Sequence, residues 1–358
     1  MLVICGGESA ERNVSVVSAK MIYNSLDPLK YEKDLIWISK KGRWIKKDFN
    51  FIDKFENSSK SRANSSLELF SREISPAGVS WEAFPLPDVI FPVLHGPLGE
   101  DGTLQGFLEL LHVPYVGCGV LGSALGMDKE FSKILAKKNG IPVLPFLCLR
   151  HPKEASLVEK RLRFPVFVKP ARLGSSVGIS RVENSADLSR AIRLAFSYDT
   201  KILIEKAISP REIECAVLGD PDSSAGDLRL RASVLGEVIP HSDFYDYKTK
   251  YLTANGAGRE IPAKLNSAQT KKIREYSIQI FRALECYGMA RVDFLVDKKT
   301  QKIYFNEINT IPGFTPTSMY PALWRASGIE ISRLLDILIK LALFRGSRVR
   351  RLSSAPAA

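Results

Sequence analysis

Two short segments near the C-terminus carry charged and amide side chains at alternating positions: Arg291 and Asp293 in the first, Glu307 and Asn309 in the second. If the apolar runs around them pair as a hairpin through a three-residue loop at 298–300, Arg291 lies opposite Glu307 and all four side chains share one face. Two carboxylates and an amide oxygen suit Mg²⁺, which binds a few carboxylates together with nucleotide phosphates. The alternative is an exposed sheet face with ordinary cross-strand ion pairs. The Pro-Gly turn that follows brings backbone N–H groups beside the acids and favours the metal site.

A loop rich in glycine and serine follows Lys169 and runs through Ser175 and Ser176 to Gly178. Backbone N–H groups in such a loop can hold phosphate oxygens, and a lysine supplies compensating charge. The loop differs from a Walker loop, because it joins two expected strands and its lysine comes first. Taken alone, the segment is equally compatible with a surface hairpin turn. Together with the acidic segments, it predicts ATP chemistry on a scaffold other than a P-loop fold.

Two further polar turns follow apolar segments in the N-terminal third. The turn at 9–12 comes after the first expected strand and includes Glu11, and His95 ends a later one. Open α/β sheets bind ligands at the carboxyl ends of their strands, so both turns are candidates for ligand contact. By itself, His95 is equally compatible with a structural histidine.

Three glycines, Gly117, Gly119 and Gly122, match the G-x-G-x-x-G dinucleotide fingerprint. That fingerprint also requires an acidic residue about 20 positions further on, at the end of a second strand. Here a lysine-rich helix is expected up to Asn139 instead. We interpret the glycines as an interdomain turn, and a nicotinamide oxidoreductase is a disfavoured alternative.

The elements that must position these residues alternate between strand and helix in the N-terminal third, which predicts an α/β domain with an open parallel sheet. We expect strands at 2–5, 34–39, 44–45, 89–94 and 113–116, and helices at 14–26 and 103–111. Residues 46–80 are rich in Lys, Ser and Asn, which is typical of a surface insertion.

The remainder of the chain mixes strands and helices without a strict alternation. We expect strands at 164–170, 177–182, 201–205, 212–218, 232–239, 290–296 and 303–308, and helices at 127–139, 186–196, 268–284 and 331–343. A tyrosine-rich loop is expected at 241–259, and the basic residues 345–358 are expected to form a disordered tail.

Length and composition indicate an ordinary globular protein, since 358 residues with 45% apolar and 25% charged side chains suggest two or three domains. The formal net charge of +12 is compatible with a polyanion partner and also with a solvated basic surface that binds no such partner. Residues 40–62 contribute +5 and the expected tail +4, so most of the excess lies outside the motifs. Because no aromatic RNA-binding motif or basic recognition helix is present, we expect no nucleic-acid partner.

The chain starts on an apolar strand and a glycine turn rather than on the basic and apolar segments of a signal peptide. No apolar run reaches the length of a membrane span, and the five cysteines are far apart without a Cys-x-x-Cys pair. We therefore expect a cytoplasmic protein with reduced thiols and no membrane insertion.

Together, these segments resemble the D-alanine–D-alanine ligases of the ATP-grasp superfamily over roughly residues 4 to 330. The stretches that carry the resemblance are GGESAERNVSVVSA, VIFPVLHGPLGEDGTLQGFLELL, GMDKEFSK, FVKPARLGSSVGISRV, REIECAVLG, DFYDYKTKY, GMARVDF and NEINTIPGFTPTSMYP. The resemblance implies an α/β (α+β), three-domain ATP-grasp architecture, in which the two later domains hold ATP between them. The ranges are an N-terminal substrate domain at 1–120, a central subdomain at 121–208, a C-terminal subdomain at 209–344 and the tail at 345–358.

The resemblance also implies the residues that bind ATP and metal. The ATP-binding residues would be Lys129, Lys169, Ser176, Glu205, Lys206, Ile208, Glu212, Lys250 and Asn306. Of these, Lys129 and Lys169 would contact the phosphates; Glu205, Lys206 and Ile208 would line the adenine pocket; and Glu212 would hold the ribose. The metal ligands would be Asp293, Glu307 and Asn309, holding two Mg²⁺ ions, or Mn²⁺, that bridge the phosphates.

The implied reaction is ATP-dependent ligation of two D-alanine molecules through an acyl phosphate, for peptidoglycan synthesis. The implied catalytic residues are Glu11, Ser175, Tyr251, Arg291 and Gly313, of which Arg291 and the Gly313 N–H would stabilise the oxyanion. The implied substrate contacts are Glu11 to the ammonium of the first D-alanine, His95 near its carboxylate, and Ser318 and the Met319 backbone to the carboxylate of the second.

The loop that carries Tyr245, Tyr247, Lys250 and Tyr251 resembles the lid that closes over the family's active site and excludes water. The related ligases that make D-alanyl-D-lactate typically replace this last tyrosine, so Tyr251 favours the dipeptide. The alternatives are another carboxylate–amine or carboxylate–hydroxy-acid ligase on the same fold, and a basic nucleic-acid-binding protein that uses ATP only structurally. The resemblance suggests D-alanine and ATP as the small-molecule partners and a homodimer as the assembly.

Overall fold

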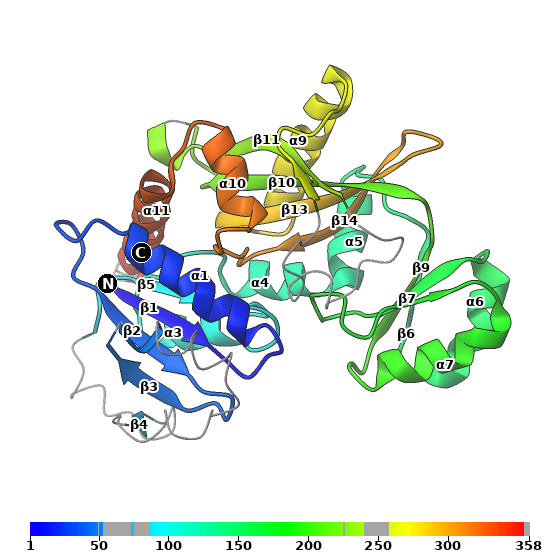
Figure 1. The fold of residues 1–358 in the computed structure, drawn as a ribbon, viewed down its shortest axis with the longest axis horizontal. Coiled ribbons are helices and arrows are strands. Elements are labelled where there is room, and N and C mark those ends of the chain that lie inside the picture. The colour runs from blue at the N-terminus through cyan, green and yellow to red at the C-terminus, as the bar shows by residue number, and fades with distance from the viewer. Residues whose placement is uncertain (49, 53–72, 75–85, 225, 240–257, 354–358) are drawn as a thin grey trace.

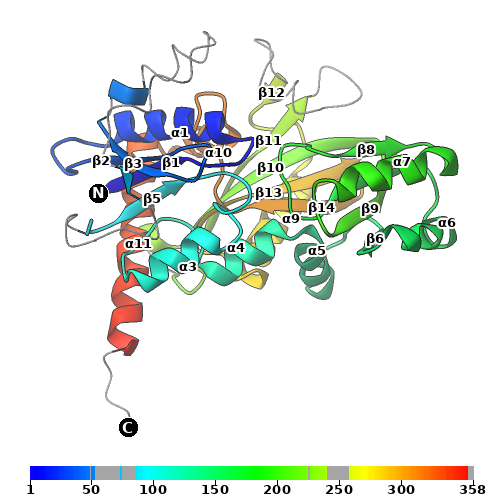
Figure 2. The same ribbon diagram turned by 90° about the horizontal axis from the view of Figure 1, so that it is seen from below.

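The computed structural model describes residues 1–48, 50–52, 73–74, 86–224, 226–239 and 258–353, which form three β-sheets and the helices that cover them (Figure 1). The first sheet has the order β4-β3-β2-β1-β5. Its strands are β1 (Leu2–Gly6), β2 (Asp34–Ile38), β3 (Trp44–Lys47), β4 (Glu73–Ile74) and β5 (Ile90–Val93). Alternate residues of β1 pack in different clusters, Val3 with helix α1 (Arg12–Ser25) and Ile4 with helix α3 (Thr103–Leu110). The two helices therefore cover opposite faces of this sheet (Figure 2).

The predicted parallel sheet is confirmed at its centre and wrong at one edge. Strand β1 runs parallel to β2 and β5, whereas β3 is antiparallel to β2, and β4 to β3. A tight turn with Gly42 at φ 73° joins β2 to β3, and strands joined by so short a turn can only be antiparallel. The run at 113–116 forms only an isolated bridge between Ile90 and Tyr115. Most of the expected insertion at 46–80 lies outside the described residues.

The second sheet is small and antiparallel throughout, with the order β6-β9-β7-β8. Its strands are β6 (Phe146–Leu149), β7 (Val166–Pro170), β8 (Ser180–Val182) and β9 (Ile202–Lys206). It is accompanied by helices α6 (Ser156–Arg161) and α7 (Ser185–Phe196) and by the short 3-10 helix η2 (Pro152–Ala155). Buried valines and isoleucines of β7 and β9 pack on α7. The loop after Lys169 thus joins two neighbouring antiparallel strands, as predicted.

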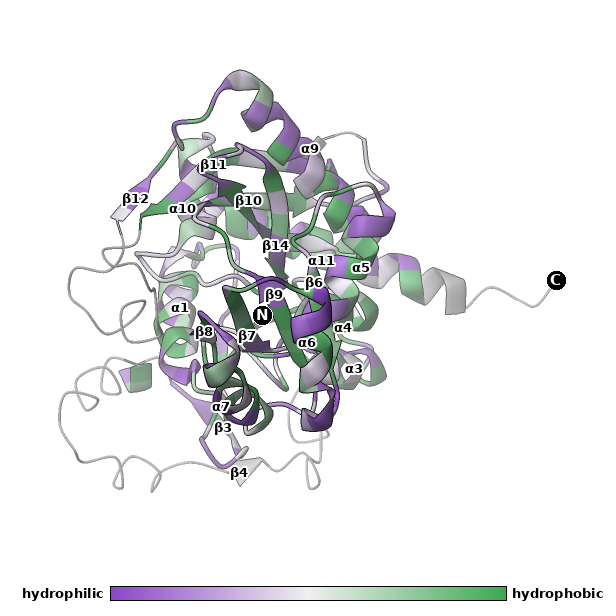
Figure 3. Ribbon diagram, turned by 90° about the vertical axis from the view of Figure 1, so that its right-hand side faces the viewer, coloured by the Kyte–Doolittle hydropathy of each residue, from purple (hydrophilic) through white to green (hydrophobic). Residues whose placement is uncertain are grey.

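The third sheet is also antiparallel, with the order β12-β11-β10-β13-β14. Its strands are β10 (Pro210–Gly219), β11 (Arg231–Ile239), β12 (Gly258–Glu260), β13 (Gly288–Asp297) and β14 (Ile303–Asn309). The accompanying helices are α9 (Ser267–Ala283), α10 (Met319–Ala326), α11 (Ile331–Ser353) and the 3-10 helix η3 (Gly226–Leu228). Val217 packs with α9 and Leu218 with α10, so these helices lie on opposite faces of the sheet. Figure 3 shows hydrophilic and hydrophobic residues interleaved along α9, as expected for a helix with one buried side.

The helix predicted at 127–139 is α5 (Lys129–Lys138), and it is preceded by a helix that was not predicted, α4 (Val120–Met127). Gly119 caps the start of α4, and Gly122 lies within it where an added Cβ would come 2.6 Å from the carbonyl oxygen of Glu285. The glycines therefore allow a helix to approach a neighbouring backbone closely. The stretch up to Lys138 is helical, so the second strand of a dinucleotide-binding unit is missing there, as predicted.

The prediction of a disordered tail from residue 345 is wrong as far as Ser353, because α11 continues to that residue and projects from the body of the molecule (Figures 2 and 3). Arg345 anchors the extension by donating hydrogen bonds to the carbonyl oxygens of Gly117 at 2.7 Å and Tyr115 at 3.1 Å. Its guanidinium also lies 4.2 Å from the ring centre of Tyr115 and 5.2 Å from that of Tyr287. These contacts tie α11 to the segments that carry Tyr115, Gly117 and Tyr287.

Candidate active site

The hairpin formed by β13 and β14 carries the predicted acidic face, but in a different register. Arg291 lies opposite Asn309, and Asp293 lies opposite Glu307. The predicted pairing of Arg291 with Glu307 is therefore wrong. The turn is longer than the three residues assumed, since the Asp297 N–H bonds to the Lys302 carbonyl, and the register shifts again between Asp293 and Phe294. Such bulges are common beside active sites, where they re-aim side chains.

Three carboxylates form a row across neighbouring strands, because Glu214 on β10 is paired with Asp293 and Asp293 with Glu307. Carboxylates that face each other directly repel, so such a row needs cations. Arg291 supplies one: it donates to the two oxygens of Asp293 at 2.8 and 2.7 Å, and its Nε lies 3.0 Å from Oε2 of Glu214. Acids from two strands thus fix the orientation of this guanidinium.

Glu307 and Asn309, the other two predicted metal ligands, are compatible with binding of a hard cation. The Oδ1 atom of Asn309 is buried and has no hydrogen-bond partner among the described residues. The side chain of Glu307 is 31% exposed, and its Oε2 lies 3.2 Å from Nζ of Lys129. Within the described ranges, no group of three or more His, Cys, Asp or Glu side chains could chelate a metal alone. A cation here would complete its shell with phosphate or water oxygens, which is how Mg²⁺ is usually held.

Three lysines from two elements reach the same region. Lys129, at the start of α5, donates to the Leu173 carbonyl at 2.7 Å in addition to its contact with Glu307. Lys169 on β7 and Lys133 on α5 both bind Glu205, at 2.7 Å from Oε2 and Oε1 respectively. Lys133 is fully buried, and Lys169 and Glu205 are nearly so. Burial lowers the pKa of Lys133 to about 8, although the Glu205 carboxylate partly opposes this.

The N-terminal domain reaches the glycine- and serine-rich loop through Glu11, the residue that caps helix α1. The hydroxyl of Ser175 donates a short hydrogen bond to Oε1 of Glu11. The other carboxylate oxygen lies so close to Gly96 and Gly174 that an added Cβ would come within 3.1 and 3.3 Å of it. Ser175 also has a positive φ of 53°, which is uncommon outside glycine and typical of functional loops. The structure thus brings together Glu11 and Ser175, two of the residues that the resemblance implies to be catalytic.

His95 and Glu100 hold the backbone of Ile311 from both sides. Nδ1 of His95 lies 2.9 Å from the Ile311 carbonyl oxygen, and the Ile311 N–H donates to Oε1 of Glu100 at 3.2 Å. The second Glu100 oxygen accepts from the Gly96 N–H at 2.6 Å. Since a carbonyl only accepts, Nδ1 must carry the hydrogen, and the buried Nε2 has no partner among the described residues. A neutral His95 ring would thus accept at Nε2, and contact with a carboxylate would need that nitrogen protonated.

Burial has the largest effect on the pKa values of His95 and Glu100. It lowers the pKa of His95, and it raises the pKa of Glu100 to about 8 with a further contribution from the charge of Glu11. The hydrogen bonds from Gly96 and Ile311 favour the ionised carboxylate of Glu100 and offset this only in part. Burial, and after it the charge of Glu11, therefore favour the protonated form of Glu100 at neutral pH.

The turn after β14 leads from Ile311 to Gly313 and the start of α10. Ser318 is the N-cap of α10, and its side chain accepts from the Thr315 N–H at 2.9 Å. An added Cβ at Gly313 would come 2.8 Å from the Ser318 oxygen, so the two residues are adjacent. The first N–H groups of a helix and its dipole attract carboxylates. Met319 is the first residue of α10, so this turn presents the predicted backbone donors.

The other predicted ATP residues are spread along neighbouring segments. Lys206 ends β9 and is exposed, and Ile208 lies in the short connection from β9 to β10, the strand that carries Glu212. Asn306 is the residue at the bulge of β14, and Ser176 follows Ser175 with a φ of 59°. These residues lie on strands of the second and third sheets or on the loops that follow them. The lid residues, including Lys250 and Tyr251, lie outside the described residues.

Three residues of the site were missed by sequence reasoning: Lys133, Glu100 and Glu214. Lys133 is one turn after Lys129, which places both on one side of α5, but Lys137 continues the same spacing and is exposed. Glu100 belongs to the loop that follows His95, and Glu214 lies between apolar residues in a strand that also carries Arg211 and Glu212. Neither signal distinguishes a site residue from a surface acid without the fold.

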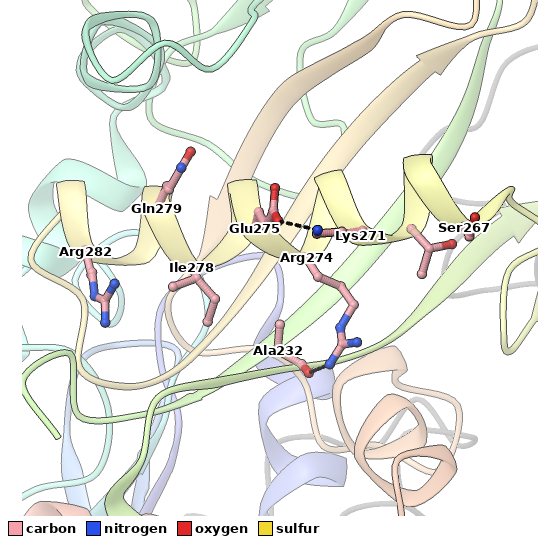
Figure 4. A pocket seen from close by; sticks show the side chains of 9 residues that line it. Ala232, Ser267, Lys271, Arg274, Glu275, Ile278, Gln279 and Arg282 are labelled. Atoms are coloured by element: carbon pink, nitrogen blue, oxygen red, sulfur yellow. Dashed lines mark hydrogen bonds and ion pairs between the residues drawn. The ribbon is translucent and has the colours of Figure 1, made fainter. Parts of the chain in front are cut away.

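A hollow on the described surface is unrelated to these residues. It has a volume of about 650 Å³ and lies along α9, where Arg274 donates to the Ala232 carbonyl at 2.9 Å and Lys271 pairs with Glu275 (Figure 4). None of its lining residues is a predicted site residue. Over the described ranges, no helix is long and apolar enough to cross a membrane.

Comparison with known families gives two matches that together cover most of the chain. Residues 1–118 match the family model described as D-ala D-ala ligase N-terminus, and residues 135–340 match the one described as D-ala D-ala ligase C-terminus. The second match contains Lys169, the acidic hairpin and the turn at Gly313, whereas Lys129 and Lys133 lie between the two matches. The first contains Glu11, His95 and Glu100.

Whole-chain relatives agree with these matches. The D-alanine–D-alanine ligase of Ruminiclostridium cellulolyticum is 44% identical over 98% of this chain and 96% of its own. Among solved structures, the D-alanine–D-alanine ligase from Coxiella burnetii is 37% identical with a TM-score of 0.81, covering 98% of this chain and 96% of that one. The VanG D-Ala:D-Ser ligase from Enterococcus faecalis is 35% identical with a TM-score of 0.78, covering 95% and 98%. The chain therefore belongs to the D-alanine–D-alanine ligase family.

Proposed function

We propose that this protein joins two D-alanine molecules to D-alanyl-D-alanine at the expense of ATP, supplying a precursor of peptidoglycan. The observation that carries the proposal is the meeting of groups from all three sheets around the Arg291–Asp293 hairpin. Lys129 reaches Glu307, Ser175 reaches Glu11, and His95 reaches Ile311. Such a site can hold a nucleotide on one side and two small zwitterions on the other.

ATP would lie between the second and third sheets, with Lys129 and Lys169 at its phosphates. The adenine would lie against Glu205, Lys206 and Ile208, and the ribose against Glu212. Asp293, Glu307 and Asn309 would hold two Mg²⁺ ions, or Mn²⁺. When bound, the metal ions would neutralise charge on the transferring phosphoryl group.

In the first step, the carboxylate of one D-alanine attacks the γ-phosphorus of ATP, forming an acyl phosphate and releasing ADP. Glu11 would hold the ammonium of this substrate, and the short hydrogen bond from Ser175 keeps the Glu11 carboxylate in place. The lysines at the phosphates would supply positive charge as ADP leaves. Formation of the acyl phosphate therefore depends mainly on how the D-alanine carboxylate is positioned against the γ-phosphate.

In the second step, the amine of another D-alanine attacks the activated carbonyl and inorganic phosphate leaves. Arg291 and the Gly313 N–H would stabilise the tetrahedral oxyanion. The N-terminus of α10, with Ser318 and Met319, would hold the carboxylate of the attacking molecule. The attacking amine must lose a proton in this step, and the departing phosphate can take it up.

Several further features remain our predictions. The lid with Tyr251 would shield the acyl phosphate from water, and the division into ranges 1–120, 121–208 and 209–344 is supported by one sheet in each. A homodimer and a cytoplasmic location are inferred from the family resemblance and the sequence.

The proposal is tested by supplying the purified protein with ATP, Mg²⁺ and D-alanine and measuring phosphate and dipeptide together. We expect equal amounts of both, with neither formed from L-alanine. Phosphate release that does not depend on D-alanine, or an absence of dipeptide, would refute it. Replacing half of the D-alanine by D-serine or D-lactate checks the second site, because a mixed product in excess of the dipeptide would assign a different second substrate.

A further inference from the structure

Lys133 is a fully buried ammonium that none of the roles above uses. It lies one helical turn beyond Lys129 on α5, so the two side chains leave the helix on the same side. Its Nζ is 2.7 Å from Oε1 of Glu205 on β9 and 3.4 Å from the carbonyl oxygen of Phe305 on β14. It therefore ties the second sheet to the third, directly beneath the proposed nucleotide.

Glu205 is shared between two lysines, and this sharing has a consequence for the nucleotide. Oε1 faces Lys133, while Oε2 faces Lys169 at 2.7 Å. Lys169 cannot approach a phosphate fully while it is the partner of a buried carboxylate. If Lys133 were missing, moving Lys169 away would leave the Glu205 charge buried and unpaired, which is strongly unfavourable.

We infer that Lys133 is a positioning residue for ATP: it holds the charge of Glu205 so that Lys169 can transfer from this carboxylate to a phosphate. The inference rests on the proposed ATP site. It assigns Lys133 no contact with the nucleotide, and it predicts that the effect of Lys133 on ATP affinity depends entirely on Glu205.

The experiment measures ATP affinity directly, by calorimetric titration without D-alanine, on wild type, K133M, E205Q and K133M/E205Q. Methionine has a similar length to lysine without the charge, and glutamine keeps an acceptor oxygen while removing the charge. K137M is the matched control, because it removes the same charge from an exposed position one turn further along α5. Steady-state kinetics for ATP and D-alanine accompany each titration.

We expect K133M to weaken ATP binding at least tenfold and to raise the KM for ATP, with the KM for D-alanine within about twofold of wild type. K137M should bind ATP like wild type. The double variant K133M/E205Q should bind ATP within twofold of E205Q alone. This last comparison holds even if K133M by itself does not fold, because the double variant leaves neither charge stranded.

Two results overturn the inference. One is a K133M protein that folds and binds ATP within twofold of wild type. The other is a double variant that binds ATP ten times more weakly than E205Q, which would mean that Lys133 acts on the nucleotide without Glu205. A wild-type protein that binds ATP but makes no dipeptide would refute the proposed function and leave this inference standing.

Discussion

Glu100 provides the sharpest test of how the site is held together, because it accepts hydrogen bonds from two loops that are distant in sequence. One oxygen binds the Gly96 N–H at 2.6 Å and the other binds the Ile311 N–H at 3.2 Å, two residues before Gly313. In E100Q, only one acceptor oxygen remains, and the new amide NH₂ faces the N–H that the ionised carboxylate accepts from near and above pH 8. One buried donor is then left without a partner and opposed by a second donor.

A buried donor without a partner raises the free energy by about 1–3 kcal/mol. If the strain is relieved by displacement of the turn that carries Gly313, the same energy is lost from stabilisation of the transition state. At about 1.4 kcal/mol per factor of ten, kcat/KM should fall roughly 5- to 100-fold. The effect should fall on kcat/KM for D-alanine, since no nucleotide contact is removed.

The free energy of unfolding of E100Q should stay the same or rise, although its kcat/KM falls. The pKa of Glu100 is raised from an ordinary value of 4.5 to about 8, so the native protein binds a proton more tightly than the unfolded chain. The unfavourable effect of the buried charge therefore grows as the pH rises from about 4.5 to about 8. At 1.36 kcal/mol per pKa unit, this interval corresponds to at most about 5 kcal/mol. E100Q lacks the charge and should be as stable as wild type, or more stable, at pH 8.

The assay compares kcat/KM and the free energy of unfolding in urea at pH 6 and pH 8 for wild type, E100Q and D101N. Asp101 is the matched control, because it also accepts from two backbone N–H groups, those of Leu98 and Thr103, within its own loop. D101N should keep kcat/KM within about threefold of wild type. The reasoning is refuted if E100Q retains full activity, or if it loses more than about 2 kcal/mol of stability at pH 8 and its activity falls only through unfolding.

Three other predictions follow from the contacts described. E307Q should abolish dipeptide formation while the circular dichroism spectrum stays unchanged, and near-normal turnover would remove Glu307 from the metal site. S175A and E11Q should each reduce kcat/KM, but the double variant should be less impaired than the product of the two effects, with a coupling of about 0.5–3 kcal/mol; additive effects would contradict the pairing. R345M should lower the free energy of unfolding by about 2 kcal/mol through loss of two carbonyl bonds and ring contacts, with KM values unchanged, and urea unfolding with parallel kinetics checks both.

The order of strands and helices was largely predictable, because a continuous apolar run such as β1 indicates a buried strand and the apolar periodicity of α9 indicates which side of the helix faces a core. The sequence predicted that the two strands of the acidic hairpin pair with each other, but not which residues lie opposite one another. A turn longer than assumed and a bulge beside Asp293 each displace the alignment, and neither changes the hydrophobic pattern. The predicted set of residues on one face still includes Arg291 and Glu307, because two one-residue shifts together preserve the alternation.

The environment of individual charges could not be predicted from the sequence. Lys133 lies in a segment, KEFSKILAKK, whose lysines look alike, yet Lys133 is buried and Lys137 is exposed. The partner of Lys133 is 72 positions away, at Glu205. Likewise, the arginines after residue 344 suggest a solvated tail, whereas Arg345 stacks on tyrosines from two distant segments. Contacts of this kind depend on the tertiary fold and leave no local pattern.

The packing of α11 has a consequence for how this chain is made. Leu334, Leu338 and Leu341 of that helix belong to the same buried cluster as Val3 and Val16 from the start of the chain. A ribosome makes these leucines more than 300 residues after Val3 and Val16, so the first sheet emerges long before the residues that complete its core exist. During synthesis, this apolar surface must remain exposed or be covered by a chaperone until α11 has emerged.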